Sequence, residues 1–195
     1  MNRFWLSAVL ICVITMASFA QGFYFDAGLG LGFATTEIGG DDMSEAFAGS
    51  GIKEIGYGAG LKMGYGPIAG LPFYLAAAAY GVGHRFSDDY NYIAFNSFLL
   101  GPSLIVYPLK NLQIAGSVGY SLTKNDSDIS GMVFLDSKSG YAGDASIAFD
   151  FSSKNNGLLL GARYFISSNT LEISEAEQKM TAFTVFLRYV YKHVK

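Results

Sequence analysis

The stretch FYFDAGLGLGF, residues 23–33, decides the fold of this chain. Every odd position in it is apolar, whereas the even positions hold one tyrosine, one aspartate and three glycines. Because a β-strand sends successive side chains to opposite faces, the segment has one apolar face and one small or polar face. Glycine weakens a strand that faces water, so a soluble sheet is a poor fit. The pattern indicates a small closed barrel with its apolar face toward lipid and a crowded interior of small or paired polar groups.

The same alternation recurs along the chain. The segment IGYGAGLKMGYG, residues 55–66, repeats it closely, with apolar side chains at the odd positions and glycines or Lys62 at the even ones. Each expected strand is long enough to cross a bilayer at a tilt, which takes about 9–11 residues. The further expected strands are residues 73–86, 92–107, 112–122, 141–151, 158–166 and 181–191.

The third expected strand is the one whose phase the sequence leaves open. The phase that we expect turns Tyr80 and Val82 outward and Arg85 inward. Phe73 and Leu75 oppose that phase. A slip of one residue would move every side chain of the strand to the other face, so the register of this strand stays open.

The connections between the eight expected strands alternate in length. Long polar connections follow the first, fifth and seventh strands, a short one follows the third, and the other three are tight turns. Long loops on one side and short turns on the other are typical of bacterial outer-membrane barrels. We therefore predict an all-β fold, an eight-stranded antiparallel up-and-down transmembrane β-barrel. The alternative is a soluble lipocalin-like barrel, which would bury the apolar face and expose rows of strand glycines to water.

Residues 1–20 are typical of a secretory signal. Arg3 supplies the positive charge, an apolar run of 13 residues begins at Phe4, and small residues occupy positions 18 and 20. The run is shorter than the roughly 20 residues that a membrane-spanning helix needs. We expect cleavage after Ala20, which leaves residues 21–195 as one outer-membrane β-barrel domain; the alternative is an uncleaved anchor.

Composition excludes several classes of function. The expected mature chain has no cysteine and hence no disulfide or thiolate chemistry. Removing Arg3 from 13 basic residues leaves 12 against 16 acidic ones, a net charge of −4, which argues against a nucleic-acid partner. The glycine-rich segments lack the GxxxxGK[ST] pattern of a phosphate loop, and the acidic loops lack the ligand spacing of a calcium loop. We therefore expect no cofactor and no metal.

Six charged residues on the inward faces of the expected strands form the candidate site, a barrel-interior ion network. A buried unpaired charge costs several kcal/mol, so we expect these acids and bases to pair with one another. The network is either a plug that fills the barrel or a narrow polar conduit; we favour the plug, because side chains just fill the interior of an eight-stranded barrel. Arg85 and Lys192 are two further charges expected to face inward. The six are Asp26, Lys62, Asp144, Asp150, Arg163 and Arg188.

The eight strands, the signal and the final aromatic strand FTVFLRYVYKHVK, residues 183–195, resemble the small bacterial outer-membrane barrels of the OmpA, OmpX and OmpW type. In those families the barrel-insertion machinery reads a terminal aromatic residue, so the resemblance implies that machinery and outer-membrane lipid as partners. Tyr191 is in phase for this role, although four residues follow it. The resemblance also implies a location in the bacterial outer membrane.

Two functions of different classes follow from this fold. The first is a structural or interaction role, in which the loops at residues 37–54 and 123–140 contact extracellular ligands. The second, implied by the OmpW resemblance, is a small channel for hydrophobic or small polar solutes. A lipid-modifying enzyme is third: His84 lies near the outer end of its strand, but no spacing matches a catalytic triad, so we expect a surface histidine and no enzyme. We expect His193 in a tail beyond the last strand.

Overall fold

The computed structural model describes residues 22–48, 51–128, 137–138, 140–153, 155–172 and 174–194. The expected signal segment, residues 1–20, lies outside the described residues. In the described part of the chain, no helix is long and apolar enough to cross a membrane.

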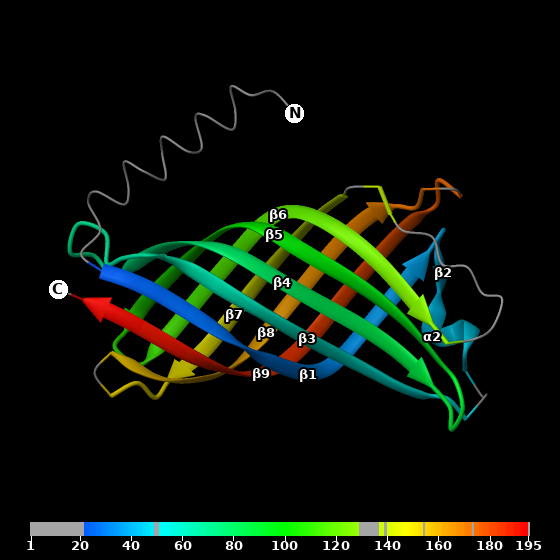
Figure 1. Cartoon of the computed structure of the whole chain (residues 1–195), viewed down its shortest axis with the longest axis horizontal. Helices are drawn as coiled ribbons and strands as arrows, with labels where there is room; N and C mark the ends of the chain where they lie inside the picture. The colour runs from blue at the N-terminus through cyan, green and yellow to red at the C-terminus, as the bar shows by residue number, and fades with distance from the viewer. Residues whose placement is uncertain are drawn as a thin grey trace.

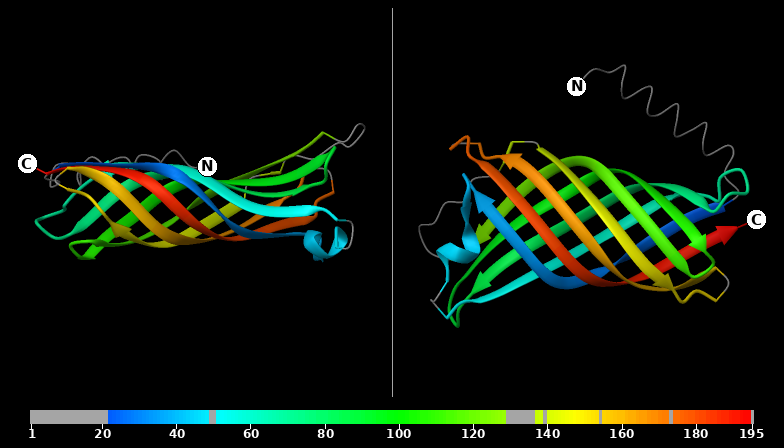
Figure 2. Two further views of the ribbon diagram at one scale, coloured as in Figure 1. Left: turned by 90° about the horizontal axis from the view of Figure 1, so that it is seen from below. Right: turned by 180° about the vertical axis from the view of Figure 1, so that it is seen from behind.

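The described residues form a closed antiparallel barrel of eight long strands (Figure 1). Each long strand pairs with the next along the chain, and β1 pairs over its whole length with β9, which closes the sheet. The predicted fold is confirmed. The barrel is flattened, because it is broad in Figure 1 and thin after the quarter turn in Figure 2. The long strands are β1 (Gly22–Ile38), β3 (Lys53–Tyr65), β4 (Phe73–Ser87), β5 (Tyr92–Leu109), β6 (Leu112–Ser127), β7 (Gly140–Asp150), β8 (Asn156–Thr170) and β9 (Glu177–Val194).

The long loops lie at one end of the barrel, and the tight turns and the C-terminus lie at the other (Figure 1). The first loop carries a two-residue strand, β2 (Asp41–Asp42), and a single-turn helix, α2 (Met43–Ala46). The strands run further than expected, so the first and third loops begin after Ile38 and Ser127. The expectation of a tail at His193 is wrong, because β9 continues and pairs this residue with Phe23. In a closed barrel every added residue finds backbone partners on both sides, which favours long strands.

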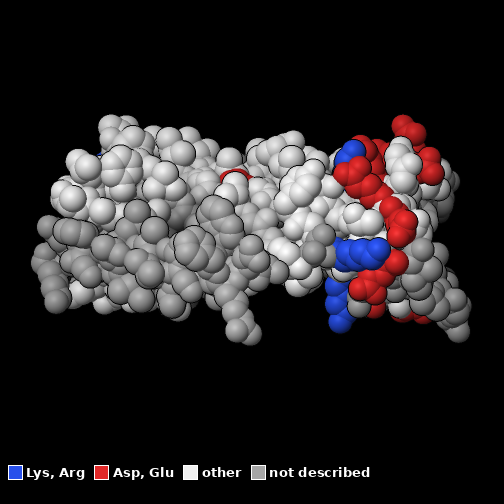
Figure 3. Space-filling view, turned by 90° about the horizontal axis from the view of Figure 1, so that it is seen from above, with Lys and Arg blue, Asp and Glu red and all other residues white. Residues whose placement is uncertain are grey.

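An apolar belt covers the outside of the barrel. Leu29 is 70% exposed in the middle of β1, although it is a large aliphatic residue. On the face in Figure 3, charged side chains gather at the loop end, and the middle of the barrel is almost free of them. Such a continuous apolar surface is too large for a water-facing protein and fits lipid instead. Other exposed members of the belt are Leu31, Phe33, Leu61, Met63, Leu100, Val118, Tyr120, Ile147, Phe149, Leu160, Tyr164, Val185 and Leu187.

The expected phase of the third long strand, β4, is wrong. Tyr80 and Val82 are buried inside the barrel, and Arg85 is exposed on the outside. Phe73 and Leu75, the two residues that opposed the expected phase, lie in phase with Arg85. The slip of one residue that the sequence left open is therefore what the structure contains.

Packing with the neighbouring strands explains this phase. Gly83 faces outward, and the ring of Tyr57 on β3 passes over it so that the Tyr57 hydroxyl donates to Asn96 Oδ1 on β5 at 2.8 Å. On the inside, the Tyr80 ring occupies the space beside Gly60, where a Cβ atom would collide with it. The glycines of β4 thus serve the outer surface, whereas its tyrosines fill the lumen.

The glycines of β1 and β3 lie side by side on one inner wall. Gly28 is opposite Gly60, and the next two glycines along each strand also face each other. A Cβ atom at Gly28 would overlap the carbonyl oxygen of Leu187 and lie 2.6 Å from Cγ of Arg188. Side chains from β4 and β9 therefore use the space that this glycine wall leaves open.

Two apolar clusters fill the interior above and below the charged layer, a feature that the expected small or polar interior did not include. The outer cluster, toward the loops, is capped by Met43 and Phe47 from the first loop. The other cluster lies toward the tight turns, which face the periplasm in outer-membrane barrels, and we call it the periplasmic cluster. The outer cluster contains Phe86, Phe95, Leu99, Phe165 and Met180. The periplasmic cluster contains Tyr24, Tyr74, Ile105, Tyr107, Leu159, Phe186 and Val190.

This packing predicts opposite sensitivities at two adjacent positions. Gly28→Ala should lower the free energy of unfolding by about 1–3 kcal/mol, because the added methyl collides with the backbone of β9. Leu29→Ala should cost less than about 1 kcal/mol, because lipid replaces the lost contacts. Urea unfolding in lipid vesicles measures both losses, with the folded fraction read from heat-modifiable gel mobility. A larger loss for Leu29→Ala than for Gly28→Ala would mean that the inner and outer faces of β1 are assigned the wrong way round.

Candidate functional site

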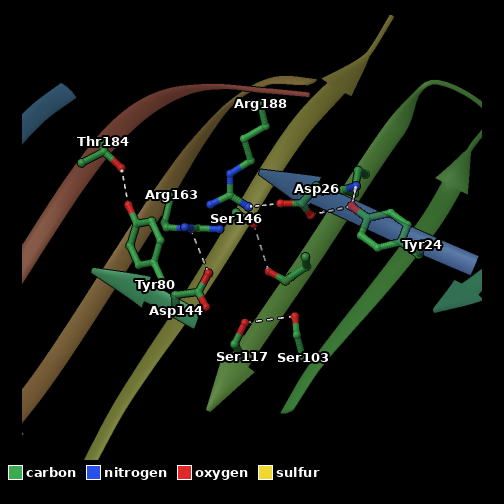
Figure 4. A network of polar contacts seen from close by, with 12 residues as sticks. Tyr24, Asp26, Tyr80, Ser103, Ser117, Asp144, Ser146, Arg163, Thr184 and Arg188 are labelled. Carbon is green, nitrogen blue, oxygen red and sulfur yellow. Dashed lines mark hydrogen bonds and ion pairs between the residues drawn. The ribbon is translucent and has the colours of Figure 1, made fainter. Parts of the chain in front are cut away.

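The first ion pair of the interior joins neighbouring strands β1 and β9. Arg188 Nη1 lies 3.0 Å from Asp26 Oδ1. The Tyr24 hydroxyl donates to the other carboxylate oxygen, Oδ2, at 2.6 Å (Figure 4). Both charged side chains are fully buried. The glycine wall makes this contact possible, because Gly28 is the direct partner of Arg188 across the sheet.

The second ion pair joins β7 and β8. Arg163 Nε lies 2.9 Å from Asp144 Oδ2, and both side chains are buried. The contact is an ion pair without the alignment of a hydrogen bond. The guanidinium of Arg163 also stacks on Tyr80, with its Cζ atom 3.8 Å from the ring centroid, in a cation–π contact (Figure 4). Tyr80 therefore connects the glycine wall to this ion pair.

Lys62 completes the central layer from β3. It is the direct cross-strand partner of Asp26 and is buried. Within the described residues, its Nζ atom has no hydrogen-bond partner. The layer thus holds the three cations Lys62, Arg163 and Arg188 against two carboxylates. Five of the six charges assigned to the interior from the sequence lie in this layer.

Asp150 does not belong to this layer, contrary to the expected pairing with the other interior bases. It lies at the periplasmic end, where Lys192 Nζ approaches its Oδ2 at 2.6 Å. The backbone N–H of Ser152 donates to Oδ1 at 2.8 Å. The Lys192 ammonium also lies 4.4 Å from the centroid of the Tyr107 ring. Asp150 ends β7 and Lys192 lies near the end of β9, with β8 between these strands, so the long lysine side chain reaches past β8 to the carboxylate at the tight-turn end.

The interior therefore consists of a charged layer between two apolar clusters. Each carboxylate has a cationic partner, and the aromatic rings of Tyr80 and Phe186 lie against the guanidinium groups. The ion pairs join neighbouring strands, whereas the stacking of Arg163 on Tyr80 connects β8 with β4 on the opposite wall of the barrel. The apolar clusters, the charged layer and the buried, hydrogen-bonded serine, asparagine and glutamine side chains together fill the lumen, which supports the plug over the conduit.

The environment of His84 differs from the surface position expected from the sequence. His84 is fully buried at the loop end of the lumen instead of lying on the surface. Its Nε2 atom lies 2.8 Å from Glu54 Oε1, and its Nδ1 atom lies 3.0 Å from Thr36 Oγ1. A carboxylate only accepts, so Nε2 carries the hydrogen, and in the neutral imidazole Nδ1 accepts from the threonine hydroxyl. The alternative phase of β4 is the one sequence feature that predicts this burial, because it turns His84 to the same inner face as Tyr80 and Val82.

Metal binding has no support in the part of the chain that the structure describes. It holds no group of three or more His, Cys, Asp or Glu side chains placed to bind a metal ion.

Acidic side chains dominate the loop end of the barrel (Figure 3). Asp88 illustrates how they are held: its carboxylate accepts the backbone N–H groups of Tyr90 and Asn91 at 2.7 Å, which lowers the pKa of Asp88 from its usual value. We call this end the acidic rim. Its acids are Glu37, Asp41, Asp42, Glu45, Glu54, Asp88, Asp89, Asp126, Asp128, Glu172, Glu175 and Glu177. They outnumber the rim bases Lys53, Arg85, Lys124, Lys138 and Lys179.

The buried pair of Asp26 and Arg188 should contribute far more to stability than an exposed pair. Asp26→Asn should lower the free energy of unfolding by about 3–5 kcal/mol, because it leaves a buried cation without its partner. Adding Arg188→Met should recover part of that loss. Lys179→Met, which breaks an exposed pair with Glu177, should cost at most about 1 kcal/mol. Urea unfolding of the unaltered protein, of Asp26→Asn, of Arg188→Met and of the double variant completes a double-mutant cycle that measures the coupling within the buried pair, and Lys179→Met is the exposed control.

No protein-family model matches this chain, and no curated protein sequence matches it. Among solved structures, the chain is similar to Ail, the attachment invasion locus protein of Yersinia pestis, in complex with the heparin analogue sucrose octasulfate. The TM-score is 0.52 at 10% identity, over 88% of this chain and 99% of that one. Neisserial surface protein A matches with a TM-score of 0.50 at 15% identity, over 88% and 97%. These likenesses concern the fold: the chain is an eight-stranded barrel of the small bacterial outer-membrane type, and its apolar belt suits that membrane.

Proposed function

We propose that the protein is a closed outer-membrane barrel that presents an acidic loop surface to cationic partners outside the cell. The observation that carries this proposal is the filled interior. The side chains that face the lumen are buried. Two apolar clusters, one charged layer and a set of hydrogen-bonded serine, asparagine and glutamine side chains fill the interior between them. A barrel without an open lumen has its outer loops as the surface available for function.

The first loop supports this role, because it covers the outer opening of the barrel. Met43 and Phe47 pack on the outer cluster, and the Phe47 ring lies 4.9 Å from that of Phe86, centroid to centroid. A strand-anchored loop on a rigid barrel presents its polar groups in a defined geometry, which reduces the entropy lost on binding.

The charge of the rim indicates the kind of partner. Acidic groups outnumber basic ones there, so the rim attracts cations and repels polyanions. Ail was solved with a sulfated sugar analogue. The rim described here has the opposite preference, so we infer that a shared fold carries a different binding specificity.

A filled barrel should not conduct. Reconstituted into planar bilayers, the folded protein should give no discrete current steps, whereas an open porin in the same bilayers provides the positive control. Heat-modifiable gel mobility of the reconstituted sample confirms that the barrel is folded. Repeated openings of uniform size would overturn the closed barrel and favour a small solute channel.

The acidic rim should bind a cationic peptide in a salt-dependent manner. Oligolysine should bind the protein in nanodiscs and be released as ionic strength rises, because salt screens exposed charges. Sucrose octasulfate should not bind. Replacing Asp41, Glu45 and Asp128 together by their amides should weaken oligolysine binding, while Lys124→Gln should strengthen it. Calorimetric titration measures these affinities; equal affinity in all variants would contradict the role of the rim.

A further inference from the structure

A small pocket lies under the first loop at the outer opening of the barrel. Its volume is about 100 Å³, and a water molecule needs roughly 10–15 Å³ by the same measure, so several waters or a small organic head group fit. Ser44 and Phe47 line it from the loop, and Glu54 and Phe86 line it from β3 and β4. The pocket therefore joins the loop surface to the barrel wall.

Among the described residues, Glu54 is the one charged group that lines this pocket, and its carboxylate is held in place. Its Oε1 atom accepts from His84 Nε2 at 2.8 Å and from the Ser44 hydroxyl at 3.1 Å. His84 on β4 is itself held by Thr36 on β1. A chain of contacts from the buried lumen therefore orients the carboxylate. The Glu54 side chain remains 42% exposed, so a ligand can reach it. A carboxylate oriented by a buried chain of polar groups is preorganised for a cation.

Aromatic rings form the other side of the pocket. Phe86 is the direct cross-strand partner of Glu54, and its ring lies 4.9 Å from that of Phe47. Phe86 is buried between the rings of Phe47 and His84, so the partly exposed Phe47 is the ring that a cation can reach. A ring face attracts cations through its quadrupole. The pocket thus combines one negative charge, one hydroxyl and two rings.

We propose that this pocket binds a primary ammonium group, such as the end of a lysine side chain or of an alkylamine. The proposal rests on the proposed function and names the group of the cationic partner that the barrel recognises. An ammonium carries three donors and one compact charge, which match the Glu54 carboxylate and the Ser44 hydroxyl. A calcium ion takes six to eight oxygen ligands, more than the pocket offers. Asp41 and Glu45 on the same loop add attraction for a cation.

The test uses n-butylammonium chloride as the probe and n-butanol as its neutral counterpart. The full barrel is isotope-labelled in nanodiscs, and amide shifts of the first loop and the start of β3 are followed by NMR. We expect saturable shifts with n-butylammonium and none with n-butanol. Glu54→Gln keeps an oxygen for His84 and Ser44 but removes the charge, and it should weaken binding at least tenfold. Glu37→Gln, which removes one rim charge outside the pocket, is the matched control and should change the affinity less than twofold.

Phe47→Leu provides a second variant, because it keeps the apolar volume but removes a ring face, and it should weaken n-butylammonium binding several-fold. Equal losses in Glu54→Gln and Glu37→Gln would overturn the pocket and show diffuse attraction to the rim. That outcome would leave the proposed function intact if oligolysine still bound. Absence of n-butylammonium binding to the unaltered protein, with oligolysine bound, would likewise overturn the pocket alone, whereas loss of oligolysine binding would overturn the proposed function.

Discussion

The fixed interior volume of an eight-stranded barrel is the constraint on which the structure depends. Every inward side chain shares that volume, so a bulky group on one wall requires a small group opposite or beside it. The glycines of β1 and β3 meet this requirement by leaving space for Tyr80 and Arg188. Without them, neither the stacking of Tyr80 on Arg163 nor the pair between Arg188 and Asp26 would fit.

That volume holds charges as well as hydrocarbon, and the charges determine what the lumen can do. The low-dielectric surroundings make an unpaired charge costly, so each carboxylate is matched with a cation across strands. Apolar clusters on both sides separate this layer from water at the two ends of the barrel. The result is a rigid filled barrel, and the groups that remain available for recognition lie at the loop end.

The loop end is connected to the lumen through His84. Its two ring nitrogens join Thr36 on β1 to Glu54 on β3, and Glu54 in turn accepts from Ser44 on α2 of the first loop. A loop that is fixed in this way keeps its acidic groups and its small pocket in one arrangement. Stability of the barrel and display of the binding surface therefore depend on the same buried contacts.

The period-two alternation of apolar residues was sufficient to predict the eight strands and the outward face of most of them. It also placed Asp26, Lys62, Asp144, Arg163 and Arg188 inside the barrel, because strand geometry alone determines on which face a residue lies. The phase of β4, the burial of His84 and the pairing of Asp150 with Lys192 were decided only by the tertiary structure. These three features depend on which side chains the other strands bring into contact, and no pattern within a single strand contains that information.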